Sequence, residues 1–151
     1  MSDSVYRFTA IFIALFFVGS IPAQAKRKAP VPQADVRTKA DLCTQTAPSG
    51  KAKVTELAQG KNVFMARLEM QPHAKVAEHR DATEEYIHIV TGTGKIFIEG
   101  KEYPVAPGTT IFMPAKAKVR FENGPDVLVG IQVFAGPGPA TKYKSWGECK
   151  K

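Results

Sequence analysis

The stretch EHRDATEEYIHIVTG, residues 78–92, concentrates side chains that can do chemistry. His79, Asp81 and Glu85 supply one imidazole and two carboxylates within a few positions. Such a set suits a hard or borderline divalent ion such as Mn, Fe or Zn, with water completing its shell. A dication would also offset two carboxylates that otherwise raise each other's pKa. The alternative is that the carboxylates lie in water at the end of a barrel and pair with neighbouring arginines.

The elements around this stretch have a sequence period of two, which is typical of strands. Short strands are predicted over 62–70, 85–90, 95–105 (a pair around residues 99–101), 109–114, 118–123 and 127–134. Glycine and proline turns separate them, and this pattern favours an antiparallel sandwich or barrel. Residues 53–60 are the one stretch that could form a helical turn or two instead.

Strand alternation predicts which side chains face the inside of this barrel. Ile87 and Ile89 share one face, and Glu85 should look inward from the end of the same strand. Val119 and Phe121 share a face of a later strand. We therefore expect Ile87, Val119 and Phe121 to line a central pocket.

The spacing of His79, Asp81, Glu85 and Gly92 resembles the first motif of the cupin superfamily, which are small jelly-roll barrels. That motif has two histidines separated by one residue, a glutamate four residues later and a glycine seven after that. The segment VAPGTTIFMPA also resembles the strand and turn between the two cupin motifs. The resemblance spans about residues 61 to 135 and implies an all-β, double-stranded β-helix fold.

The second cupin motif places a histidine five residues after a proline and an asparagine four residues further on. Here the proline is Pro114, the histidine position holds Val119, and the asparagine is Asn123. Two of the family's three histidines are therefore replaced, one by Asp81 and one by Val119. The metal motif is degenerate, and we expect His79, Asp81 and Glu85 to converge inside the barrel with Val119 facing them.

The other two histidines fit less well as ligands. His88 is three residues from Glu85 on one strand, so the two face opposite sides, and His88 should lie on the outer face or in a dimer interface. His73 stands at the position of the family's leading glycine and should lie in a solvated turn.

The first 25 residues are typical of a secretory signal peptide, with Arg7, an apolar run and Ala23-Gln24-Ala25 at the end. An uncleaved membrane anchor is the alternative. Cleavage would leave a chain that begins at Lys26, exported to a periplasm or secreted. The predicted segments are the signal peptide 1–25, a basic N-terminal arm 26–53, the cupin-like barrel 54–135 and a C-terminal tail 136–151.

Export changes the interpretation of the two cysteines. In an oxidising compartment Cys43 and Cys149 should form a disulfide that ties the arm to the tail. A free redox pair is the alternative, although no Cys-x-x-Cys spacing is present.

The net charge of +7 is concentrated near the ends of the chain. Residues 26–53 and 142–151 together carry 11 Lys/Arg and 3 Asp/Glu, whereas residues 54–141 carry 9 and 10. The basic arms would allow weak contact with anionic surfaces, and a solvated tether is the simpler interpretation. The pattern argues against nucleic-acid binding, because basic residues do not alternate with exposed aromatic residues.

Two functions of different classes follow from these residues. The first is an exported binding module that holds a small polar ligand, a divalent metal ion or both. The second is a metal-dependent enzyme, such as an isomerase, lyase or oxygenase, acting on a small acid or sugar. A homodimer is also expected.

Overall fold

The computed structural model describes residues 33–147 and 149 of the chain. The predicted signal peptide, residues 1–25, lies outside this described part. Within the described residues, ten strands form nearly all of the regular structure: β1 (Cys43–Thr46), β2 (Ala52–Gln59), β3 (Val63–Met70), β4 (Lys75–Arg80), β5 (Glu85–Thr91), β6 (Gly94–Ile98), β7 (Lys101–Val105), β8 (Thr110–Met113), β9 (Lys118–Asn123) and β10 (Leu128–Ala135). Three short helical elements accompany them: η1 (Lys39–Asp41), η2 (Gly138–Ala140) and α1 (Thr141–Lys144).

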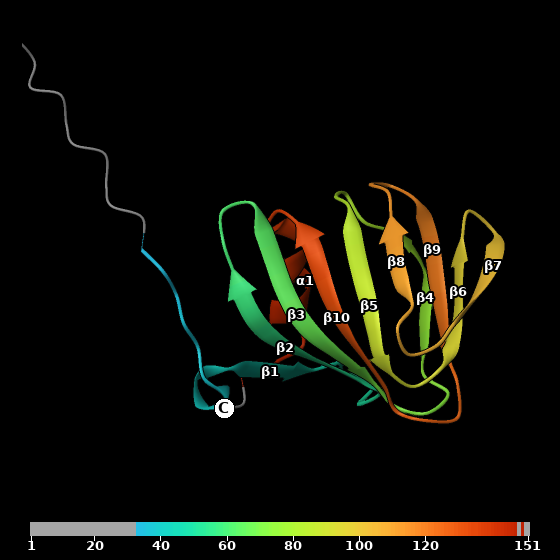
Figure 1. Cartoon of the computed structure of the whole chain (residues 1–151), viewed down its shortest axis with the longest axis horizontal. Helices are drawn as coiled ribbons and strands as arrows, with labels where there is room; N and C mark the ends of the chain where they lie inside the picture. Colours follow the sequence, from blue (N-terminus) through green and yellow to red (C-terminus); the bar gives the residue numbers. More distant parts are fainter. Residues whose placement is uncertain (1–32, 148, 150–151) are drawn as a thin grey trace, which may run out of the picture. The chain divides into compact units, whose positions relative to one another are not determined.

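The strands form two antiparallel sheets that face each other, as Figure 1 shows. The larger sheet has the order β1-β2-β3-β10-β5-β8, and the smaller has the order β4-β9-β6-β7. Neighbours such as β3 and β10 are far apart in sequence, which is the long-range pairing of a jelly roll. The all-β fold predicted from the sequence is confirmed.

The core lies between the sheets because alternate side chains of each strand point inward. In β3 the side chains of Phe64, Ala66 and Met70 are buried, as the alternation predicts. The turn after β5 depends on Gly92, which has a φ of 82°. A Cβ atom at Gly92 would lie 2.6 Å from the Cα of Leu128, so no larger residue fits there.

Two segments form strands that the sequence does not predict. Residues 43–46, inside the expected N-terminal arm, form β1 and pair with β2. Residues 53–60 do not form a helical turn, because all but Gly60 belong to β2, which pairs with β3 along most of its length. Propensity could not show this, since the strand is stabilised by its neighbours in the sheet.

The C-terminal segment is part of the folded unit. Tyr143 of α1 is buried and its ring packs on Phe64 and Phe134, which lie on the inner face of β3 and β10. In Figure 1, α1 accordingly lies behind these two strands. The tail that the sequence predicts as a separate segment therefore closes part of the hydrophobic core.

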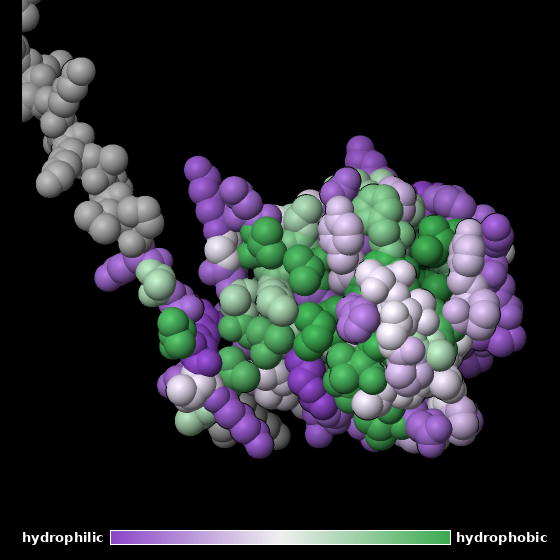
Figure 2. All heavy atoms as spheres, in the orientation of Figure 1, coloured by the Kyte–Doolittle hydropathy of each residue, from purple (hydrophilic) through white to green (hydrophobic). Residues whose placement is uncertain are grey.

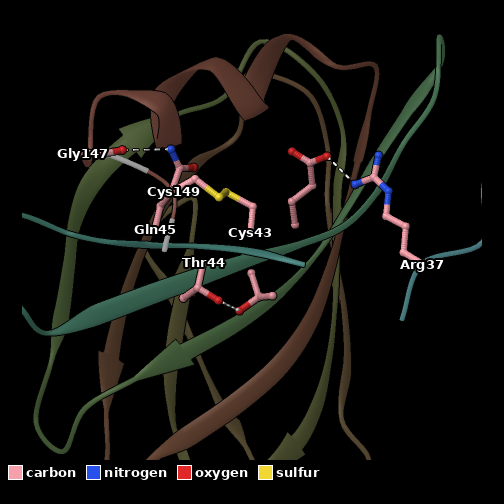
Figure 3. The surroundings of a disulfide bond; sticks show 8 residues. Arg37, Cys43, Thr44, Gln45, Gly147 and Cys149 are labelled. Atoms are coloured by element: carbon pink, nitrogen blue, oxygen red, sulfur yellow. Dashed lines mark hydrogen bonds and ion pairs between the residues drawn. A yellow bond between two sulfur atoms is a disulfide. The ribbon is translucent and has the colours of Figure 1, made fainter. Parts of the chain in front are cut away.

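A disulfide bond joins Cys43 of β1 to Cys149, with 5.3 Å between their Cα atoms. Figure 3 shows this bond together with the hydrogen bond that Gln45 donates to the carbonyl of Gly147. The bond fixes the end of the C-terminal segment to the edge strand of the larger sheet. The predicted pairing of the two cysteines is present in the structure.

The outer face of the larger sheet carries exposed apolar side chains. Tyr86 and Phe112, side by side on β5 and β8, are 41% and 48% exposed, and their ring centroids lie 5.0 Å apart. Figure 2 shows apolar residues on the face in view, over this sheet. His88 is exposed on the same face and its Nδ1 lies 2.9 Å from Thr110 Oγ1, so the predicted outer-face position holds. The expected homodimer stays a prediction.

No helix among the described residues is long and apolar enough to cross a membrane.

Candidate ligand-binding site

A cavity of about 350 Å³ lies between the two sheets. Apolar side chains from both sheets form most of its wall: Leu68, Met70, Ile87, Ile89, Ile96, Ile111, Met113, Val119, Phe121 and Leu128. Polar groups border it too, among them His79, Glu85, Gln132, Lys142 and Tyr143. A largely apolar space with a few polar groups is the common form of a small-molecule site.

Glu85 is the polar group most affected by the cavity. It is the first residue of β5, opposite Met113 of β8 and Phe134 of β10. Its side chain is buried, and its carboxyl group makes no hydrogen bond within the described part of the chain. Burial raises the pKa of Glu85 to about 7, although the positive charge of Lys142 acts in the opposite direction. This carboxyl group can therefore take up or release a proton near neutral pH.

His79 borders the same cavity from β4. Its Nδ1 lies 2.9 Å from the carbonyl oxygen of Ala77, and its Nε2 lies 3.5 Å from the Asp81 carboxylate. The contact with Asp81 raises the pKa of His79, and burial opposes this only in part. Both ring nitrogens thus face acceptors, an arrangement that favours the protonated imidazolium.

Asp81 lies beside His79 but does not border the cavity. It follows the end of β4, and its carboxylate contacts His79 and Lys142 and is absent from the cavity wall. The contact with His79, aided by the charge of Lys142, lowers the pKa of Asp81. The structure therefore brings His79 and Asp81 together. Glu85 borders the same cavity as His79, whereas Asp81 does not border it.

The C-terminal segment supplies three residues that the sequence analysis did not single out. Lys142, Tyr143 and Trp146 all border the cavity. The Tyr143 hydroxyl accepts a hydrogen bond of 2.7 Å from the buried side-chain amide of Gln132. The sequence did contain a signal for the burial of this segment, because it holds a tyrosine and the single tryptophan of the chain. Aromatic side chains are usually buried when a core is near. No local pattern marked Lys142.

Comparison with known proteins gives the family. A family model described as "Cupin domain" matches residues 66–129. This segment contains β4 to β9, the two predicted motifs and Glu85. The protein is a member of the cupin superfamily.

Solved cupin structures resemble this one in fold. An RmlC-like cupin from Shewanella frigidimarina has a TM-score of 0.62 at 13% identity, covering 69% of this chain and 92% of that chain. KdgF from Halomonas sp. has a TM-score of 0.60 at 15% identity, covering 68% and 94%. A predicted oxalate decarboxylase from Thermotoga maritima has a TM-score of 0.59 at 20% identity, covering 68% and 99%. A comparison with curated proteins finds no match.

Cupins commonly bind metal ions, and the side chains at the positions of the two motifs decide whether this barrel has the donor atoms for one. Val119 occupies the second-motif histidine position; it is buried, borders the cavity and lies opposite His79 in the β4–β9 pair. Its side chain offers no donor atom. Both carboxylate oxygens of Asp81 contact the Lys142 ammonium. Among the described residues no three His, Cys, Asp or Glu side chains are placed to hold a metal ion, so this set does not fit one.

The remaining residues that the sequence analysis named lie in the cavity wall, in a turn or in the core. Ile87, Val119 and Phe121 all border the cavity. His73 lies in an exposed turn with a φ of 58°, a left-handed conformation consistent with the glycine that cupins have there. Asn123 is buried, and its side-chain amide donates to the carbonyl oxygens of Gln71 and Asp126, so it braces the loop before β10.

Proposed function

We propose that this cupin binds a small molecule with an apolar body and one polar group inside the barrel. The observation that carries the proposal is the apolar cavity of about 350 Å³ with the buried, unpaired carboxyl group of Glu85 on its wall. A carboxyl group that has no partner on the wall of a largely apolar cavity gains a hydrogen bond when a ligand supplies a matching group there. The small polar ligand considered from the sequence is therefore refined to one that is mostly apolar.

The polar end of such a ligand would lie near Glu85, Lys142 and Tyr143. Near neutral pH Glu85 can donate or accept a hydrogen bond, because its pKa is about 7. The Tyr143 hydroxyl accepts from Gln132 and keeps its own proton to donate. A carboxylate, carboxamide or hydroxyl on the ligand would match these groups, whereas a sugar would leave most of its hydroxyls against apolar walls.

Trp146 gives a direct assay, because it borders the cavity and is the only tryptophan in the chain. The probes are cyclohexanecarboxylate, cyclohexanecarboxamide and cyclohexanol, which do not absorb where tryptophan emits, with glucose as the polar comparison. All titrations contain a metal chelator. We expect a saturable change in Trp146 fluorescence with at least one cyclohexane probe and none with glucose.

A matched pair of variants localises the binding. Val119→Phe fills part of the cavity, whereas Val90→Phe makes the same change at a side chain that is 46% exposed. Val119→Phe should weaken probe binding by about tenfold or more, since overpacking and lost volume both act against the ligand. Val90→Phe should leave it unchanged. Equal affinities in the two variants, or no saturable response to any probe, would refute the proposal.

Proton transfer without a metal is a second candidate function. The one observation that favours it is the pKa of Glu85. A carboxyl group that titrates near pH 7 beside His79 suits a general acid or base. The metal-dependent enzyme considered from the sequence has less support, because the donor set does not fit a metal. Loss of turnover in Glu85→Gln with probe binding retained would distinguish an enzyme from a binding module.

We also propose that the protein works after export from the cytoplasm. The Cys43–Cys149 disulfide supports this, since such bonds persist in oxidising compartments. Intact-mass measurement of the protein from its native compartment tests the cleavage before Lys26. A mass that still includes residues 1–25 would contradict it.

A further inference from the structure

The ammonium group of Lys142 occupies an unusual position for a lysine near a chain end. Its Nζ lies 3.2 Å from both carboxylate oxygens of Asp81, so the cation is shared equally between the two oxygens. The Asp81 side chain is only 18% exposed, which reduces the screening of this pair by water. The contact is thus a partly buried, charge-assisted one rather than a solvated surface pair.

The same ammonium group also makes cation–π contacts with two aromatic rings. Lys142 Nζ lies 4.7 Å from the centre of the Phe134 ring and 5.3 Å from that of Tyr143. Both distances are within the range in which a ring face attracts a cation. The ammonium also borders the cavity and acts on the charge of Glu85.

The fold fixes the backbone that carries this lysine. Tyr143, the next residue, is buried between the rings of Phe64, Phe134 and Trp146 and is bonded to Gln132. Further along, the disulfide at Cys149 ties the segment to β1. Lys142 therefore reaches Asp81 from an anchored segment, and its position does not depend on a free tail.

We propose that Lys142 is a built-in cation that takes the place of a divalent metal ion in this barrel. It balances the negative charge of Asp81 beside Glu85, engages both Asp81 oxygens and repels a second cation. Two features of the barrel act against metal binding in the same direction. Val119 supplies no donor atom, and Lys142 places a positive charge on the Asp81 carboxylate. This inference does not depend on which molecule the cavity binds.

The decisive test is to remove the ammonium and ask whether metal enters. Zn²⁺ and Mn²⁺ are titrated by calorimetry into the full chain without a histidine tag, for the parent and for Lys142→Met. Lys144→Met is the matched control, because Lys144 lies exposed on the same short helix. We expect the parent and Lys144→Met to show no stoichiometric site, and Lys142→Met to bind one Zn²⁺ at least about tenfold more tightly.

The site of the gained metal is checked with second variants. Adding Asp81→Asn to Lys142→Met should abolish the gain, since Asp81 is the carboxylate that Lys142 contacts and that the substitution frees. Should Lys142→Met fail to fold by circular dichroism, Lys142→Gln removes the charge while keeping a polar side chain, and the same gain is expected.

Two outcomes would overturn the inference. One is a stoichiometric Zn²⁺ or Mn²⁺ site in the parent that Asp81→Asn removes. The other is folded Lys142→Met or Lys142→Gln protein with no increase in affinity over Lys144→Met. Neither outcome touches the binding of the cyclohexane probes, which is measured in the presence of chelator.

Discussion

His79 and Val119 lie directly opposite each other in the antiparallel pair of β4 and β9. Side chains at such positions have Cβ atoms about 4.5–5.5 Å apart, so an imidazole at position 119 would reach the same point as His79. Val119 is thus the histidine position of the second cupin motif in space as well as in spacing. The pair shows that this barrel keeps the position of the second-motif histidine without its donor atom.

Restoring the donor should restore metal binding only when the ammonium is also removed. Val119→His with Lys142→Met is expected to bind Zn²⁺ about tenfold or more tighter than Lys142→Met alone, because it adds a fourth ligand. Val119→His alone should gain much less, since Lys142 still holds Asp81. Zinc calorimetry on the three variants is the measurement. Equal affinities for the double and single variants would show that position 119 does not face the ligands.

Glu85 should make the protein less stable as the pH rises. Its folded pKa of about 7 lies above the ordinary value of 4.5, so the folded state binds more protons in this window. The stability that the protonated form provides is complete below about pH 4.5 and is lost as the pH rises through about 7. The full loss is on the order of 3 kcal/mol, taken as an upper figure because the group can relax.

Glu85→Gln is the matched variant for this pH effect, because glutamine keeps the shape and cannot titrate. Urea unfolding of both proteins between pH 4.5 and 8 should show Glu85→Gln gaining stability relative to the parent as the pH rises. Parallel pH curves for the two proteins would mean that Glu85 is not buried in the folded state.

The Tyr143 hydroxyl should stabilise the attachment of the C-terminal segment. Tyr143→Phe leaves the buried amide of Gln132 without its acceptor, which should cost about 1–3 kcal/mol of unfolding free energy. Tyr103→Phe makes the same change at a side chain that is 40% exposed, and should cost little. Urea unfolding gives both values. A Tyr143→Phe protein as stable as Tyr103→Phe would contradict the packed position of α1.

The Cys43–Cys149 bond should stabilise the fold and hold the residues that border the cavity. Replacing both cysteines by serine is expected to lower the unfolding free energy by about 2–4 kcal/mol, on the basis of loops of this length. The change should also alter Trp146 fluorescence, because Trp146 lies near the bond in sequence and borders the cavity.

The serine variant also serves as the control for reduction. Dithiothreitol should shift the unfolding midpoint of the parent toward that of the double-serine protein and leave the double-serine protein unchanged. A parent midpoint that does not move with full reduction would mean that the bond contributes nothing to stability.

The amino-acid sequence by itself determined most of the strands, namely β3 and β5 to β10, and which way their side chains face. Alternation is a local property, so Ile87 and Ile89 on one face and His88 on the other could be assigned from neighbours two positions apart. The spacing of His79, Glu85 and Gly92 was enough for the superfamily, and the position of Val119 was enough to show a degenerate motif. The two cysteines, together with the predicted secretory signal peptide, were enough to expect their bond.

Tertiary structure decided the chemistry of the site. Asp81 is paired with Lys142, which lies 61 residues later in the chain. Residues 53–60 become a strand because β3 is available to pair with them. Lys142, Tyr143 and Trp146 border the cavity because aromatic packing and a disulfide bring the chain end back to the barrel. Such contacts join residues far apart in sequence, so no local period or spacing encodes them.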